Sequence, residues 1–125
     1  MLDNLKSLAG LGSLLKDLPK IKERMAALKD RLGQQTVTGE TGGGAVRVTA
    51  TGLLRVVAIK VDPALLAGLV DSTDPQDKAM AEDLIAGAVN MALQKARELA
   101  EKEAAAAAAE LGLPFPSGGL GGLMS

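Results

Sequence analysis

The sequence predicts an α+β fold in which a three-stranded antiparallel sheet is flanked by an N-terminal helix and a long C-terminal helix. Two changes of period predict it. Apolar residues recur every three or four positions up to Gly33 and again after Asp74, whereas residues 35–61 alternate between apolar and polar. A chain of 125 residues is expected to form one domain. Phe115 is its only aromatic residue, so the core must be aliphatic, and pairing of two copies would add the buried surface that a small chain lacks.

The first helix is predicted from an apolar seam with the heptad spacing of a narrow helix–helix contact. The seam consists of Leu14, Leu18, Ile21, Met25, Leu28 and Leu32. Pro19 interrupts it, and a proline inside a helix costs about 3 kcal/mol. We therefore expect the helix to begin near Leu18 with Asp17 as its N-cap, and a longer, kinked helix is the alternative. Gly33 is expected to end it.

Three strands are predicted between residues 35 and 61. The first covers residues 35–39 and is followed by a glycine-rich turn at 40–44. The second, 45–51, alternates valine and alanine with arginine and threonine, as in a sheet with one buried face. Gly52 and Leu53 are expected to form a two-residue type II′ turn, in which glycine takes the first central position.

The third strand, residues 54–61, is apolar on both faces. Leu54 and Val56 are expected on one face, and Val57, Ile59 and Val61 on the other. One layer of helix would leave one of these faces in water, so a second layer or a second subunit is implied.

The last helix is predicted from a strong start signal. Asp62 and Pro63 end the sheet, and residues 64–70 are expected to form a helical turn or two. Asp74 then offers an N-cap and Pro75 suits the first helical position. The helix is expected to run to about Leu111, a length of about 50 Å at 1.5 Å per residue, so its C-terminal half should project. Its predicted seam is Ile85, Val89, Ala92, Ala96 and Leu99.

Composition excludes several classes of function. The chain has no Cys and no His, so disulfides, the usual zinc sites and the catalytic triads that need His or Cys are excluded, and a reducing cytoplasm is expected. The glycines at 37–44 lack the Lys-Ser/Thr ending of a phosphate-binding loop and lie between two strands, which favours a hairpin connection. We expect no enzyme activity, cofactor, metal or small-molecule substrate. No signal peptide or membrane span is expected, since the weakly apolar run at 104–109 is far too short.

The net charge of −1 hides an asymmetry along the chain. Residues 1–33 carry seven Lys/Arg and four Asp/Glu, and residues 34–61 carry three Lys/Arg and one Glu. Residues 62–125 carry four Lys/Arg and ten Asp/Glu. Local charge governs docking onto a polyanion more than the total does, so the N-terminal half is the expected side for nucleic acid.

Basic side chains fall into stripes on the predicted helices at about 100° per residue. One flank of the first helix carries Lys16, Lys20, Arg24 and Arg31, the other carries Lys22 and Lys29, and a flank of the last helix carries Lys95 and Lys102. No aromatic platform for single-stranded bases and no recognition-helix signature is visible. These residues therefore predict binding of duplex DNA through its phosphate backbone.

Three blocks of the sequence resemble the YbaB/EbfC family of bacterial nucleoid-associated DNA-binding proteins. They are VTGETGGGAVRVTATG at 37–52, VVAIKVDPALL at 56–66 and DKAMAEDLIAGAVNMALQKARE at 77–98. The resemblance implies a tweezer-like homodimer in the cytoplasmic nucleoid that binds double-stranded DNA and contributes to nucleoid organisation and gene regulation. It supplies no fixed set of DNA-contacting residues, so the basic residues named above come from the helical wheel.

The expected organisation is a partly flexible N-terminal segment at 1–17, a DNA-binding and dimerisation domain at 18–111, and a disordered Gly/Pro-rich tail at 112–125. The alternative function is a dimeric protein–protein interaction scaffold, whose acidic last helix binds basic partners and whose DNA binding is incidental. The acidic balance of residues 62–125 favours that alternative.

Overall fold

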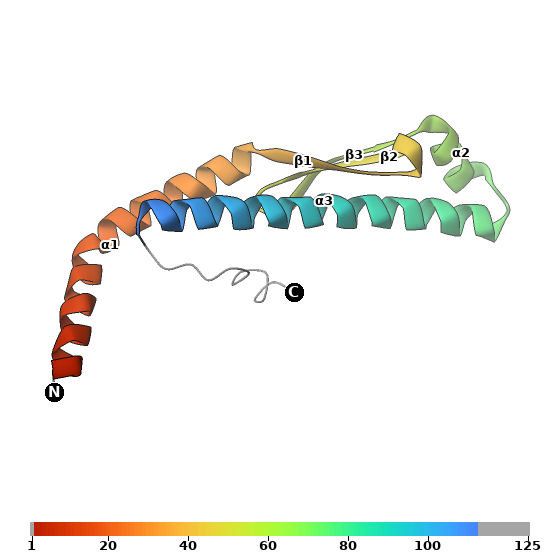
Figure 1. Ribbon diagram of the computed structural model, residues 1–125. Coiled ribbons are helices and arrows are strands. Elements are labelled where there is room, and N and C mark those ends of the chain that lie inside the picture. Colours follow the sequence, from red (N-terminus) through yellow and green to blue (C-terminus); the bar gives the residue numbers. More distant parts are fainter. Residues whose placement is uncertain (1, 113–125) are drawn as a thin grey trace.

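The computed structural model describes residues 2–112, with side chains from residue 15 onward, and confirms the predicted α+β class. A three-stranded sheet lies along one side of the long C-terminal helix. The N-terminal helix, which leads into the sheet, lies near the C-terminal end of that helix and extends beyond it (Figure 1). The elements are α1 (Leu2–Gln34), β1 (Thr36–Thr41), the 3-10 turn η1 (Gly42–Gly44), β2 (Val46–Thr51), β3 (Arg55–Val61), α2 (Pro63–Asp71) and α3 (Pro75–Glu110). Phe115 and the predicted tail beyond Gly112 lie outside the described residues.

The core lies between the sheet and α3. The strands are antiparallel in the order β1-β2-β3, so β2 is central. Its inward residues Val46, Val48 and Ala50 are fully buried, which confirms the predicted alternation, and they pack against alanines of α3. Since successive residues of a strand point to opposite faces, Arg47 and Thr49 lie on the face away from α3.

The face of α3 that meets the sheet is a stripe of alanines, Ala88, Ala92 and Ala96. Of the predicted seam, Ala92 and Ala96 are fully buried, while Ile85, Val89 and Leu99 are partly buried at its sides. The helix thus faces the sheet with its smallest side chains, and its larger ones fill the flanks. Thr41 secures the far end of β1 by donating its hydroxyl hydrogen to the carbonyl oxygen of Leu84 at 2.5 Å.

The turn between β2 and β3 is not the predicted type II′ turn. Three residues connect the strands, and the positive φ, 63°, belongs to Leu54 rather than to Gly52. Gly52 is required for a different reason. Its N–H donates to the carbonyl oxygens of Leu32 and Gln35 at 2.9 and 3.1 Å, and a Cβ there would lie 2.8 Å from Leu32 Cδ2. The hairpin therefore docks directly on the C-terminal end of α1.

A β-bulge in β3 corrects the predicted assignment of its two faces. Ala58 pairs with Thr49 and Val56 pairs with Ala50, so Val57 is the extra residue. The irregularity shifts the alternation by one, and Val56, Ile59 and Val61 all pair with inward residues of β2. Leu54 belongs to the turn. Val57 and Ile59 remain about half exposed, because β3 is the edge strand that α3 covers least.

The expectation that the first helix begins near Leu18 is wrong. Helix α1 runs from Leu2 to Gln34 with Pro19 inside it, which is the longer alternative, and Figure 1 shows a bend in its N-terminal half. Proline removes one backbone hydrogen bond, and the residues around Pro19 are exposed, so water can satisfy the freed carbonyl group.

Of the seam residues from Leu18 onward, only Leu28 and Leu32 at its C-terminal end are buried. Leu28 and Leu32 pack against Ala107 of α3, whereas Leu18 and Met25 are exposed. The C-terminal half of α3 therefore does not project, contrary to expectation, because α1 covers it. The N-terminal part of α1 extends beyond α3 instead (Figure 1).

The predicted start of the last helix at Asp74 is confirmed, and the short helix predicted at 64–70 is present as α2 with Asp62 as its N-cap. Asp62 Oδ1 accepts from the N–H of Ala64 at 2.8 Å, and Asp74 Oδ1 accepts from the N–H of Gln76 at 2.9 Å. A proline occupies the first turn in each case. Within residues 2–112, neither α1 nor α3 contains a stretch apolar enough and long enough to cross a bilayer.

Candidate nucleic-acid interface

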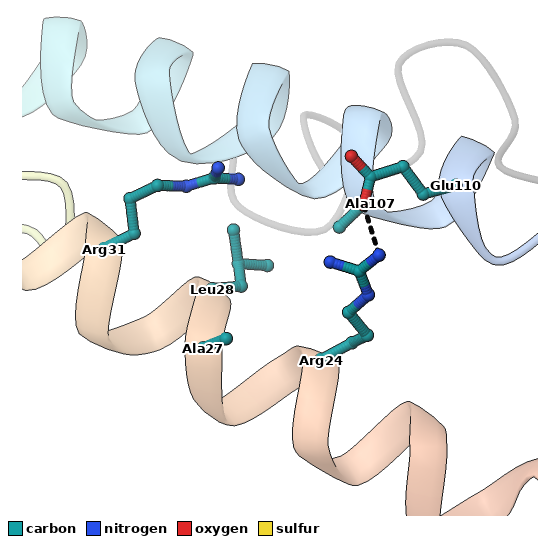
Figure 2. A pocket seen from close by; sticks show the side chains of 6 residues that line it. All are labelled: Arg24, Ala27, Leu28, Arg31, Ala107 and Glu110. Atoms are coloured by element: carbon teal, nitrogen blue, oxygen red, sulfur yellow. Dashed lines mark ion pairs between the residues drawn. The ribbon is translucent and has the colours of Figure 1, made fainter.

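The predicted basic residues of α1 lie on two flanks with different surroundings. On the first flank, α1 faces the C-terminal end of α3 across a small cavity of about 190 Å³. Figure 2 shows Arg24, Leu28 and Arg31 of α1 pointing toward Ala107 and Glu110 of α3. The arginines of this flank therefore lie close to an acidic helix.

Two ion pairs join the helices at this junction. Arg31 Nη2 lies 2.7 Å from Glu103 Oε2, and Arg24 Nη2 lies 3.2 Å from Glu110 Oε2. The side chain of Glu103 is only 20% exposed, so the first pair is partly shielded from water, whereas both side chains of the second are about half exposed. Exposed pairs of this kind stabilise by less than about 1 kcal/mol. The positive charge of both arginines is already partly balanced within the chain.

The remaining lysines of the first flank and those of the second are free of such pairing. Lys16, Lys20, Lys22 and Lys29 are exposed, and among the side chains of residues 15–112 none of them forms an ion pair. Three of the four precede Arg24, in the part of α1 beyond the end of α3. The exposed acids Asp17 and Glu23 lie on the same segment, but neither forms an ion pair with these lysines among the side chains of residues 15–112.

Lys29 also borders an open apolar groove of about 400 Å³ beside the β2–β3 turn. The groove is lined by Met25, Leu28, Leu32 and Leu53, together with Ala26. The stem of Lys29 can lie along such a surface while its ammonium group stays in water. Lys29 is thereby placed next to the tip of the sheet.

The two predicted lysines of α3 differ from each other. Lys95 Nζ donates to the carbonyl oxygen of Thr38 at 2.9 Å, which occupies an acceptor on the free edge of β1. Lys102 is exposed. Lys95 therefore helps to cover a sheet edge, a structural role that the helical wheel could not reveal.

The helical wheel missed a third group of cations, on the sheet. Arg47 of β2 and Arg55 and Lys60 of β3 are all exposed. The alternation of residues 45–51 predicts that Arg47 lies on the face of the strand opposite to that of the buried valines. Recognising Arg55 and Lys60 as its neighbours required the strand register.

The described residues offer little for other kinds of site. Within that part of the chain, no three acidic side chains gather in a way that suits a metal ion. Residues 2–112 also contain no aromatic side chain, so they hold no ring on which a base could stack. The arrangement favours contacts to phosphate groups.

Comparisons with known proteins agree with this chemistry. The model of the YbaB/EbfC DNA-binding family matches residues 8–111. A nucleoid-associated protein of Anaeromyxobacter sp. is 38% identical over 105 residues, which cover 84% of this chain and 95% of that protein. Another from Moorella thermoacetica is 36% identical over 107 residues, covering 86% and 96%. The crystal structure of an uncharacterized protein from Helicobacter pylori matches with a TM-score of 0.59 and 26% identity, covering 75% of this chain and 88% of that one.

Proposed function

Because this chain belongs to the YbaB/EbfC DNA-binding family, we propose that it acts as a nucleoid-associated protein that binds duplex DNA as a homodimer. Binding is mainly to the phosphate backbone, alters DNA conformation and contributes to nucleoid organisation and gene regulation in the bacterial cytoplasm. The names of its relatives from Anaeromyxobacter and Moorella support the nucleoid as its location.

The observation that carries the proposal is the exposed lysines on the part of α1 beyond α3, which form no ion pair with any side chain of residues 15–112. Lys16, Lys20 and Lys22 lie there, and Lys29 follows at the groove. Each lysine that neutralises a phosphate releases condensed counterions, which drives binding without reading the sequence. Lys95 and Lys102 of α3 belong to the same proposed set. Arg24 and Arg31 contribute less, because Glu110 and Glu103 compete with phosphate for them.

The proposed dimer is supported by apolar surface on one protomer. Edge strand β3 exposes Val57 and Ile59, and the neighbouring elements expose Leu66, Val70 and Met80 at 49, 73 and 57%. An unpaired edge with apolar side chains favours association with another chain. A second copy that covers this surface would supply the buried area that a thin two-layer protomer lacks.

The alternative of a protein-binding scaffold loses part of its basis. Its acidic helix would need free carboxylates, yet Glu103 and Glu110 already pair with arginines of α1. Helix α3 carries other acids as well, so the experiment must still distinguish DNA binding from binding of basic proteins.

The proposal is tested by fluorescence-anisotropy titration of a mixed-sequence duplex at several salt concentrations, with sedimentation measured in parallel. We expect a dimer whose log affinity falls linearly with log salt, by about 0.9 per phosphate neutralised. The variant Lys22→Gln/Lys29→Gln should lower the slope by about 1.8 for each protomer that contacts the duplex, which is about 3.6 for the dimer. Its matched control is Lys78→Gln/Arg97→Gln, which removes two cations of α3 outside the proposed set. A monomer, or a dimer that ignores duplex DNA at low salt, contradicts the proposal, and capture of basic proteins instead would favour the scaffold.

A further inference from the structure

The face of the sheet that points away from α3, called here the outer face, has an unusual pattern of charge. The register places Arg47 of β2 directly opposite Lys60 of β3, and Thr51 opposite Arg55. Side chains directly opposite each other share a face, so all three cations lie together on the outer face. Glu40 of β1, which pairs with Arg47, is the one acid that the register of the three strands adds there.

These charges do not serve the stability of the sheet. Like charges directly opposite each other on neighbouring strands are destabilising, and Arg47 and Lys60 are such a pair. Glu40 offsets this only in part, since its contact with Arg47 at 3.2 Å is about half exposed on both sides. Among the side chains of residues 15–112, Arg55 and Lys60 form no ion pair. A polyanion would relieve this repulsion.

The rest of the outer face suits phosphate as well. Thr36 and Thr38 of β1 and Thr49 of β2 occupy the same face by register, and hydroxyl groups are frequent donors to phosphate oxygens. Because of the bulge, Arg55 and Lys60 lie opposite Thr51 and Arg47, which are four residues apart, so the two cations are roughly 13 Å apart at 3.3 Å per residue. Duplex DNA carries one charge per about 1.7 Å of axis, so the two side chains can engage different phosphates of one duplex.

The outer face adjoins the cations of α1. Lys29 and Leu53 line the same groove, and Arg55 begins β3 two residues after Leu53. The route from Lys22 through Lys29 to Arg55 and then Lys60 therefore follows the surface from α1 onto the sheet. The opposite flank of α1 leads instead to the acids of α3.

We propose that the outer face is a second phosphate-binding surface for duplex DNA, carried by Arg47, Arg55 and Lys60 and continuous with Lys22 and Lys29 of α1. This inference rests on the proposed function and adds the surface along which the duplex runs. It assigns the sheet a direct role in binding, where the helices alone were predicted to contact DNA.

The test compares Arg55→Gln/Lys60→Gln with the charge-matched control Lys78→Gln/Arg97→Gln in the same salt titration. The outer-face variant should lower the log–log salt slope by about 1.8 for each protomer that contacts the duplex, about 3.6 for the dimer, with the dimer and the helical content unchanged. The control should keep the wild-type slope to within about 0.5 of a unit. If wild-type protein binds duplex DNA and both variants keep its slope, the outer face is not a contact surface, although the proposed function stands. If wild-type protein does not bind, the proposed function itself fails.

A second measurement separates lost contact from lost folding. Lys60→Thr removes the like-charge neighbour of Arg47 and introduces a residue that favours strands, so it should raise the denaturation midpoint while weakening DNA binding severalfold. Saturating duplex DNA should also protect Lys60 from an amine-acylating reagent, and it should leave Lys78 as reactive as in the free protein. Equal reactivity of Lys60 with and without DNA would overturn the inference.

Discussion

Gly39 lies against the backbone of α3 so closely that a Cβ at this position would be 2.5 Å from the carbonyl oxygen of Ala88. The same Cβ would lie 2.5 Å from the nitrogen of Ala92. Neither atom belongs to a side chain that can turn aside. The separation of strand β1 and helix α3 therefore depends on the absence of a single methyl group.

Replacement Gly39→Ala should accordingly destabilise the protein by about 1–3 kcal/mol or more, as overpacking of a close-packed core does. Urea unfolding followed by circular dichroism measures this. Gly68→Ala in α2 is the matched control, because nothing lies within 4 Å of its Cβ and alanine favours a helix. An unchanged midpoint for Gly39→Ala would contradict the close approach of β1 and α3.

The ion pair between Arg31 and Glu103 predicts an unusual response to loss of an acid. Glu103→Gln should raise affinity for duplex DNA, because it releases Arg31 to bind phosphate, and should cost less than about 1 kcal/mol of stability. Glu98→Gln removes the same charge from the same helix, but the contact of Glu98 is with Gln94. Anisotropy titration should therefore show a larger gain for Glu103→Gln, and equal gains would contradict the competition.

The apolar edge strand predicts how the proposed dimer can be broken. Ile59→Lys places a charge on the inward-pairing side of β3, where Ile59 is 49% exposed in the protomer, and burying that charge unpaired at an interface is strongly unfavourable. We expect sedimentation equilibrium to give the mass of a monomer that remains folded. Ala58→Lys adds the same charge to the opposite face of the same strand and should remain dimeric. A dimer of wild-type strength for Ile59→Lys would place the interface elsewhere.

Pro19 predicts a change in the first helix. Pro19→Ala restores a backbone donor inside α1 and removes an intrinsic penalty of about 3 kcal/mol, so helical ellipticity should rise and the helix should straighten. Pro63→Ala is the control, since Pro63 lies in the first turn of α2, where proline is well tolerated. Far-ultraviolet circular dichroism and small-angle scattering provide the two readouts. Unchanged ellipticity would mean that Pro19 does not limit the helix.

Much of the fold could be predicted because its signals are local. The N-cap at Asp74 with Pro75 after it lies within a few residues, and so does the alternation that buries Val46 and Val48. The alanine stripe was only half recognised, because hydrophobicity ranks Ile85 and Val89 above Ala88. Small alanines are favoured on this face of α3 because the backbone of Gly39 lies so close to it. That contact joins residues far apart in the sequence, so no local pattern reveals it.

The candidate site was predicted less completely for the same physical reason. A helical wheel places Arg24 and Arg31 correctly on one flank of α1, but their partners Glu110 and Glu103 are remote in sequence. The bulge at Val57 decides which residues of β3 share a face with Arg47, and no local pattern in the sequence predicts this bulge. Exposure of a cation could thus be predicted, whereas its electrostatic neighbours could not.

The paired hydrogen bonds from Gly52 to Leu32 and Gln35 make the long helix and the hairpin one mechanical unit. Any tilt of α1 must carry the hairpin tip with it, since a single amide holds both carbonyl groups. Between Pro19 and Leu32, a force on α1 therefore passes directly to the β2–β3 turn and to the first residues of β3, whereas the bend in the N-terminal half of α1 lies outside this unit.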